Sequence, residues 1–235
     1  MPRSRKRIER PQRSFFVLTA GRMCFSLEID HYSIIMTSAA LLVIDVQNDF
    51  CPGGALPVPH GDEVIRPINR VVRHAEEKFI FTLFSQCWHP AVTTHFKEHG
   101  GKWPPHCIQS TSGAEFHPDL YRPVTISIVR KGMGREEDAY AATEGYLLYQ
   151  GEYAILEVAL RGQRVKKVVL AGLATDYCVL ATALELRQLG FEVTVLEDGC
   201  RGVELNPGDT AAAIEAMKDA GVVVTTSDQI NFEAD

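Results

Sequence analysis

The sequence lacks three features that would place it in familiar classes of protein. It has no basic excess, because 24 lysines and arginines stand against 30 aspartates and glutamates, whereas nucleic-acid binders usually carry a surplus of positive charge. It has no apolar run approaching the roughly 18 residues that cross a bilayer. Its six cysteines follow no disulfide-framework spacing. We therefore expect a chain that binds neither nucleic acid nor membrane and that resides in a reducing compartment, the cytoplasm by default.

The residues that are present indicate one large domain preceded by a basic segment. A length of 235 residues with 46% hydrophobic residues suits a single α/β domain over residues 38–235. Residues 1–37 are set apart, because the first thirteen contain six arginines and lysines and a single acid, Glu9. An arginine-rich, acid-poor start is typical of organelle transit segments. The alternatives are a disordered tail or an upstream extension with Met36 as the working start.

Apolar runs that alternate with helical patterns predict a parallel sheet. Strand-like runs occupy residues 40–44, 79–84, 124–129, 168–171, 191–196 and 222–225. Helical patterns occupy residues 62–77 and 152–161, a stretch ending at 189 that Thr175 or Asp176 could cap, and a stretch opened by Asn206 and Pro207. Because strands and helices alternate, right-handed crossovers follow. The predicted fold is a three-layer α/β/α, Rossmann-like domain with a central, mostly parallel six-stranded sheet.

Three chemically different side chains fall just past the ends of separate predicted strands. Asp45 follows the first strand, Lys131 the third and Cys178 the fourth. Because the carboxyl ends of parallel strands lie side by side and border the crevice where ligands bind, we expect the three to converge there. A carboxylate, an ammonium and a thiol brought together are the parts of a thiol-dependent hydrolase.

Each of the three residues has a chemical role and a plainer alternative. Cys178 sits at a helix start, where backbone amides favour a thiolate, although most free cysteines are structural. Asp45 could accept the thiol proton, or it could order the following loop, a role that fits Asp49 better. Lys131 would favour both anions, or it could be a solvated lysine.

Histidines gather in the long segment that leaves the second predicted strand. Five of the eight histidines lie between positions 89 and 117, and His89, His95 and His106 share one loop without periodicity. Imidazoles gathered in one loop are good metal ligands, but scattered solvated histidines are also common in loops. The spacing by itself leaves both interpretations open.

Several motifs in order resemble the isochorismatase-like cysteine hydrolases, and within them the nicotinamidase/pyrazinamidase group. The resemblance runs from about Ala40 to the C-terminus. The motifs are Asp45-Val-Gln-Asn-Asp-Phe50 with Pro52-Gly-Gly-Ala-Leu56, Trp88-His-Pro90, Trp103-Pro-Pro-His-Cys107 and Gly172-Leu-Ala-Thr-Asp-Tyr-Cys178. The Trp-Pro-x-His-Cys element points to nicotinamidases in particular.

The resemblance implies a complete catalytic and binding set. Asp45, Lys131 and Cys178 match the catalytic triad of the group. A cis peptide is implied between Leu173 and Ala174, with the amides of Ala174 and Cys178 forming the oxyanion hole. The implied substrate-binding residues are Phe50 and Trp103, which match positions on either side of a pyridine ring, together with Leu173. His89, His95 and His106 match the metal ligands.

One position departs from the pattern of the group. An Asp-x-His pair usually stands at the metal, and this chain has Cys87-Trp-His89 instead. A thiolate can replace a carboxylate as a ligand, and sulfur with imidazole favours zinc over manganese or magnesium. We therefore expect a zinc ion bound by Cys87 with the three histidines. The alternative is that Cys87 does not coordinate, which leaves a three-histidine site.

The activity that the resemblance implies is the hydrolysis of nicotinamide to nicotinate and ammonia through a cysteine thioester, within NAD salvage. Pyrazinamide would be a second substrate. The alternatives are another amide, carbamoyl or isochorismatase-type hydrolase of the superfamily, or a non-catalytic zinc-binding module. Small members of the group often self-associate, so a homo-oligomer is one expected state that the sequence does not fix.

Overall fold

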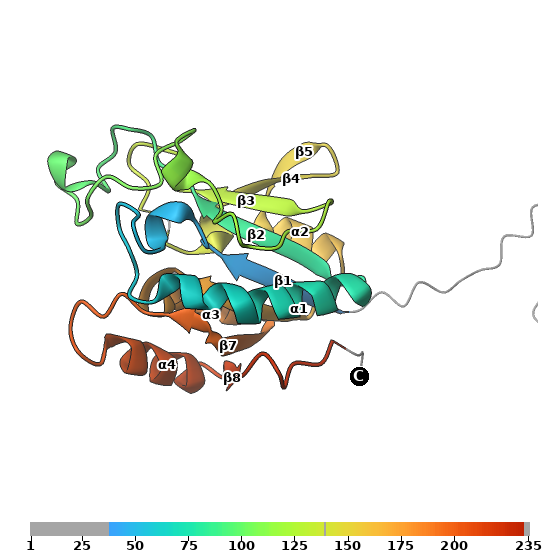
Figure 1. The fold of residues 1–235 in the computed structure, drawn as a ribbon. Coiled ribbons are helices and arrows are strands. Elements are labelled where there is room, and N and C mark those ends of the chain that lie inside the picture. Colours follow the sequence, from blue (N-terminus) through green and yellow to red (C-terminus); the bar gives the residue numbers. More distant parts are fainter. Residues whose placement is uncertain (1–37, 139, 233–235) are drawn as a thin grey trace, which may run out of the picture. The chain divides into compact units, whose positions relative to one another are not determined.

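An eight-stranded sheet forms the centre of the computed structural model, which describes residues 38–138 and 140–232 (Figure 1). The predicted basic segment, residues 1–37, lies outside this part of the chain. The strands are β1 (Ala39–Ile44), β2 (Phe81–Cys87), β3 (Ser127–Lys131), β4 (Tyr146–Tyr149), β5 (Glu152–Ile155), β6 (Lys167–Leu173), β7 (Glu192–Arg201) and β8 (Val223–Thr225). They stand in the order β5-β4-β3-β2-β1-β6-β7-β8. All neighbouring pairs are parallel except β3–β4 and β4–β5. The mostly parallel sheet is confirmed, with eight strands instead of six.

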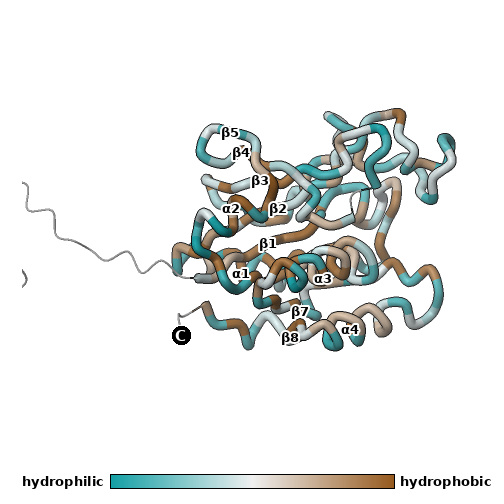
Figure 2. The backbone as a smooth tube through the Cα atoms, turned by 180° about the vertical axis from the view of Figure 1, so that it is seen from behind, coloured by the Kyte–Doolittle hydropathy of each residue, from teal (hydrophilic) through white to brown (hydrophobic). Residues whose placement is uncertain are grey.

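Helices cover both faces of the sheet and complete three layers. They are α1 (Ile65–Glu77), α2 (Leu156–Gly162), α3 (Leu180–Gln188) and α4 (Asp209–Asp219). Leu41 and Val43 of β1 pack into the core on the α1 side. Leu42 and Ile44 face the other side, where α2, α3 and α4 contribute the core. This double burial explains why β1 is an uninterrupted apolar run (Figure 2). Within the described ranges, no helix has the length and apolar character to cross a membrane.

The two strands absent from the sequence prediction form one antiparallel hairpin. The predicted helix over 152–161 is wrong in its first turn, because residues 152–155 form β5 and α2 begins only at Leu156. Gln150 and Gly151 connect β4 to β5 with φ values of 52° and 89°. Positive φ at both positions of a two-residue loop is the geometry that tight hairpins favour. The Gln-Gly pair was the local signal for this turn.

Strands β2 and β3 end later than predicted, and the difference moves Lys131 into the sheet. The predicted run 124–129 begins too early, because Val124 is fully exposed and β3 starts at Ser127. Pairing with β2 sets this register, with Leu83 opposite Ser127 and Cys87 opposite Lys131. Lys131 is therefore the last residue of its strand, and Cys87 ends the neighbouring one.

The predicted helix caps also differ from the structure. Residues 175–179 form a wide π turn that follows Ala174 and leads into α3, and no side chain caps it. Asp176 instead accepts hydrogen bonds from the backbone amides of Val203 and Glu204, both at 2.9 Å. The last helix begins at Asp209, two residues beyond the predicted first-turn proline.

The alternation of buried and exposed side chains along β4 predicts two very different mutations. Leu147 is 1% exposed and Leu148 is 64% exposed. We expect Leu147→Ala to lower the free energy of unfolding by about 2–5 kcal/mol, because it leaves a core cavity. Leu148→Ala should change it by less than about 0.5 kcal/mol. Urea unfolding of both variants measures this, and equal losses would contradict the strand assignment.

Candidate active site and metal site

The carboxyl ends of three strands bring Asp45, Lys131 and Cys178 together, and we refer to them as the Asp–Lys–Cys group. Asp45 directly follows β1, Lys131 ends β3, and Cys178 lies in the π turn after β6. All three are buried, at 0%, 1% and 8% exposure. The Lys131 Nζ lies 2.9 Å from Asp45 Oδ2 and 3.4 Å from Cys178 Sγ. The structure thus assembles the three side chains that the sequence placed at one edge.

Asp45 and Lys131 form an ion pair that is closed to solvent. Ser85, in the middle of β2, donates its hydroxyl to Asp45 Oδ1 at 2.7 Å and accepts the Asp45 backbone amide at 3.3 Å. Burial alone would lower the pKa of Lys131, but the nearby charge of Asp45 is the main effect that raises it above its ordinary value. Lys131 therefore remains an ammonium. Ser85 was missed by the sequence analysis, where a serine within an apolar strand was its only signal.

Cys178 is held as a neutral thiol. Its hydrogen bond with Cys87 and its burial raise the pKa of the Cys178 thiol well above the ordinary value, against the lowering effect of Lys131. The prediction of a thiolate favoured by the helix start is therefore wrong for the protein at rest. The thiol needs a base to become a nucleophile, and the Asp45 carboxylate lies in the same buried group.

The backbone that precedes Cys178 packs closely against the end of β1. The peptide between Leu173 and Ala174 is cis, as the resemblance implies. Gly172 has a φ of +135°, and a Cβ there would lie 2.0 Å from the Ile44 carbonyl oxygen. Only glycine allows β6 to approach β1 this closely. The approach carries the following π turn, and with it Cys178, to the end of β1.

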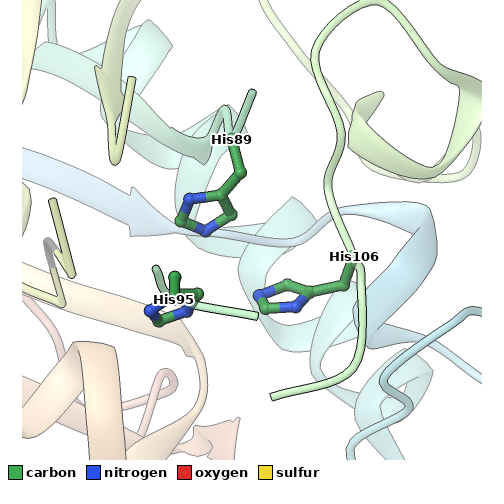
Figure 3. A group of neighbouring side chains, drawn as sticks. All are labelled: His89, His95 and His106. Carbon is green, nitrogen blue, oxygen red and sulfur yellow. The ribbon is translucent and has the colours of Figure 1, made fainter. Parts of the chain in front are cut away.

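His89, His95 and His106 form a second buried group, the histidine group, whose rings point toward one another (Figure 3). Their available ligand nitrogens all lie within 4.8 Å of one another. The ring centroids of His89 and His95 are 4.6 Å apart, and that of His106 lies 5.1 Å from His89 and 5.4 Å from His95. Three imidazoles at this spacing fit the binding of one metal ion.

Hydrogen bonds at one ring nitrogen orient each imidazole. Nδ1 of His89 lies 3.1 Å from the Gly132 carbonyl oxygen, Nδ1 of His95 2.7 Å from an Asp138 carboxylate oxygen, and Nδ1 of His106 2.8 Å from the Pro104 carbonyl oxygen. Such partners fix the tautomer and leave Nε2 with its lone pair. His89 Nε2 is buried and has no hydrogen-bond partner. A metal ion would satisfy this atom.

The protonation states of the histidines suit metal binding. Burial lowers the pKa of His89 to about 4 and that of His106 to about 3, with positive charge from Lys131 contributing in both cases. Burial also lowers the pKa of His95, against its hydrogen bond to Asp138. All three are neutral near pH 7, which is the form that coordinates metal.

Cys87 lies with the Asp–Lys–Cys group and not with the histidines. Its sulfur is 3.0 Å from Lys131 Nζ and donates a hydrogen bond to Asp45 Oδ2 at 3.6 Å. Among the described residues, the sets able to hold a metal are the three histidines and, separately, Asp45, Cys87 and Cys178. The predicted role of Cys87 as a fourth zinc ligand is not supported by this arrangement, because Lys131 and Asp45 draw its sulfur away.

Aromatic side chains line a pocket that also contacts Lys131, Cys178, His95 and His106. Phe50 stands against His106 with 5.4 Å between ring centroids. Trp103 donates its indole N–H to the Tyr140 hydroxyl at 2.9 Å and meets the ring of Tyr177 edge-on at 5.0 Å. Phe50 and Trp103, the aromatic residues that the resemblance implies for substrate binding, therefore both line this pocket. Tyr140 was missed because it lay in no recognised pattern, and Tyr177 was not singled out although it belongs to the motif at residues 172–178.

Leu173, the third residue predicted to bind substrate, packs its side chain into the core on the α1 side. It is 1% exposed and is not among the residues that line the pocket. In this structure its contribution is therefore the cis peptide that it forms with Ala174.

Two side chains after β1 tie the histidine-bearing segment to the sheet. Gln47 donates to the carbonyl oxygens of Cys87 and Ala114 at 2.9 and 2.8 Å and accepts the Cys87 amide at 2.8 Å. Asp49 accepts the Cys107 amide at 2.7 Å. Asp49 also accepts the Ala55 amide at 3.1 Å, which confirms its suggested role of ordering the loop that follows, and the buried Gln47 was not anticipated.

Comparison with known sequences places the chain in a family. A model of the isochorismatase domain matches residues 39–229. A nicotinamidase of Escherichia coli is 37% identical over 206 residues, which cover 81% of this chain and 96% of that protein. A nicotinamidase/pyrazinamidase of Mycobacterium tuberculosis is 34% identical over 191 residues, which cover 80% and 98%.

Solved structures agree with the sequence comparison. A pyrazinamidase of Pyrococcus horikoshii in complex with zinc is 41% identical and has a TM-score of 0.73, covering 80% of this chain and 99% of that one. PnC1 from L. infantum, in complex with nicotinate, is 34% identical with a TM-score of 0.72, covering 82% and 94%. With the domain match spanning most of its length, the chain belongs to the isochorismatase family of hydrolases.

Proposed function

We propose that this amidohydrolase is a nicotinamidase, which converts nicotinamide and water to nicotinate and ammonia. The observation that carries the proposal is that Lys131 and Cys178 of the Asp–Lys–Cys group line the same aromatic pocket as His95 and His106 of the histidine group. An amide-cleaving thiol and a site for a ring nitrogen are the two elements that a pyridine carboxamide requires. Relatives that cover most of the chain are named nicotinamidases.

The first half of the proposed reaction transfers the acyl group to sulfur. Asp45 accepts the proton of Cys178, and the sulfur attacks the carboxamide carbon. The backbone amides of Ala174 and Cys178 form the oxyanion hole, and the cis peptide before Ala174 and the π turn that contains Cys178 support this role. Asp45 then gives its proton to the departing ammonia, which leaves a thioester on Cys178.

The second half of the reaction releases the acid. Asp45 is again a carboxylate beside Lys131 and accepts a proton from the attacking water. The water oxygen adds to the thioester carbon, and the sulfur leaves as the thiolate. Proton return from Asp45 restores the thiol, so that the group ends in the state in which it began. Lys131 remains charged throughout, because either the Asp45 carboxylate or the Cys178 thiolate is its anionic partner at each step. Asp45 Oδ2 lies 2.9 Å and Cys178 Sγ 3.4 Å from its Nζ.

The histidine group would hold a zinc ion through His89, His95 and His106. Bound there, the ion supplies a Lewis acid for a ring nitrogen or a polarised water. Imidazole ligands suit zinc, copper, iron and nickel, and three histidines are a ligand set known from zinc sites. Phe50 and Trp103 hold the ring between them, which orients the carboxamide toward Cys178.

Pyrazinamide is the proposed second substrate, because it differs from nicotinamide by one ring atom and presents the same carboxamide. The product nicotinate would feed NAD salvage. Both statements rest on the same pocket and the same nucleophile.

Replacing the nucleophile should abolish turnover while leaving the pocket intact. We expect Cys178→Ala to lower kcat for ammonia release from nicotinamide by about 10⁴-fold or more, because no other group can form the thioester. Nicotinate should still raise the Tm of the variant. The matched control is Cys200→Ala, another buried cysteine outside the pocket, which should retain turnover. Ammonia release by Cys178→Ala at a rate near that of wild type would refute the assignment.

Replacing one ligand should remove the metal. We expect wild type purified without added metal to carry about one zinc per chain and His89→Ala to carry less than about a tenth of that, because two imidazoles make a weak site. His99→Ala removes an exposed histidine of the same segment and should not change zinc content.

Cys87→Ala should also keep its zinc, since the Cys87 sulfur lies on Lys131 and Asp45. Elemental analysis of the four proteins decides this. A zinc content in Cys87→Ala as low as that in His89→Ala would establish Cys87 as a ligand.

A further inference from the structure

Two thiols meet across one lysine in the pocket, and the proposed reaction uses only one of them. The Lys131 Nζ lies 3.0 Å from Cys87 Sγ and 3.4 Å from Cys178 Sγ. The two sulfurs and an Asp45 carboxylate oxygen all lie within 4.8 Å of one another. Cys87 is 4% exposed, yet it lines the same pocket as Cys178. A small molecule that reaches one sulfur therefore reaches the other.

We propose that Cys87 and Cys178 form a reversible disulfide when the protein meets a hydroperoxide. A disulfide bond is about 2.05 Å long, so the two sulfurs must draw closer by side-chain rotation. The two cysteines lie on separate segments, the end of β2 and the π turn after β6. The bond would thus link these two segments next to Asp45 and Lys131. Cys87 is then the resolving cysteine of an oxidation site centred on the nucleophile.

The chemistry balances with the hydroperoxide as the two-electron oxidant. Asp45 accepts the Cys178 proton, and the sulfur attacks the terminal peroxide oxygen. The O–O bond breaks, the leaving alkoxide or hydroxide takes up a proton, and Cys178 becomes a sulfenic acid. The Cys87 thiol then attacks the sulfenic sulfur, forms the S–S bond and releases water. In total two thiols and one hydroperoxide give one disulfide, one alcohol or water, and one further water.

Lys131 and Asp45 promote both steps. The ammonium contacts both sulfurs and favours the anionic form of whichever attacks. Asp45 Oδ2 accepts a hydrogen bond from Cys87 Sγ, so a base is already aligned with the second thiol. Without Cys87, the sulfenic acid would persist and oxidise further to sulfinic acid, which thiol reductants do not reverse. The disulfide with Cys87 therefore protects Cys178 from irreversible oxidation, and it blocks the nucleophile until the bond is reduced.

The test is a mass and thiol measurement on the purified, metal-containing full chain. After a few equivalents of hydrogen peroxide and a catalase quench, wild type should lose 2 Da, which two lost hydrogens account for. Free thiols under denaturing conditions should fall from the six of the sequence to four. Peptide mapping should find residues 87 and 178 cross-linked. Dithiothreitol should restore both mass and thiol count, and neither readout depends on the proposed amidase activity.

Variants separate resolution by Cys87 from simple oxidation. Cys87→Ala and Cys87→Ser should gain about 32 Da at Cys178 that dithiothreitol does not reverse, as expected for a sulfinic acid. Cys107→Ala removes another buried cysteine near Cys178 and should still form the 87–178 cross-link. A wild type that gains 32 Da at Cys178 without a cross-link, or that cross-links Cys178 to Cys107, would overturn the proposal.

Discussion

The fully buried ion pair between Asp45 and Lys131 is the constraint on which the rest of the site depends. Each charge loses its water, at a cost of several kcal/mol, and each is tolerable only because the other lies 2.9 Å away. Asp45 directly follows β1 and Lys131 ends β3, with β2 between these strands, so the pair holds only if all three strands keep their register. Ser85 of β2 bonds the same carboxylate and closes the arrangement. The register of the three strands positions the ion pair, and the ion pair in turn stabilises that register.

The same strand that separates the two charges also joins the two groups of the pocket. Ser85, Cys87 and His89 follow one another at a spacing of two, the period of extended chain. Ser85 contacts Asp45, Cys87 contacts Lys131, and His89 belongs to the histidine group. Gln47 clamps the backbone at Cys87 from the end of β1. The histidines and the nucleophile thus share a pocket because one segment passes from the sheet edge into the metal-binding loop.

Much of this was predictable from the sequence, and the failures have physical causes. The apolar runs located the strands that carry Asp45, Lys131 and Cys178, because parallel strands are buried on both faces. The β4–β5 hairpin was missed, since its four-residue strands are too short for a clear period and depend on the turn at Gly151. The partners of Cys87 could not be predicted, because side-chain direction at a strand end is decided by tertiary contacts that no local pattern encodes.

The neutral thiol of Cys178 follows from the charge balance of this buried site. With Asp45 ionised and Lys131 protonated, the net charge of the group is already zero, and a resting thiolate would add an uncompensated charge to a buried site. Transfer of the proton from Cys178 to Asp45 leaves the sum at zero and only moves the anion from oxygen to sulfur. Lys131 lies within reach of both atoms, at 2.9 and 3.4 Å, so it keeps an anionic partner before and after the transfer. A nucleophile can therefore be generated inside this buried site without any net change in its charge.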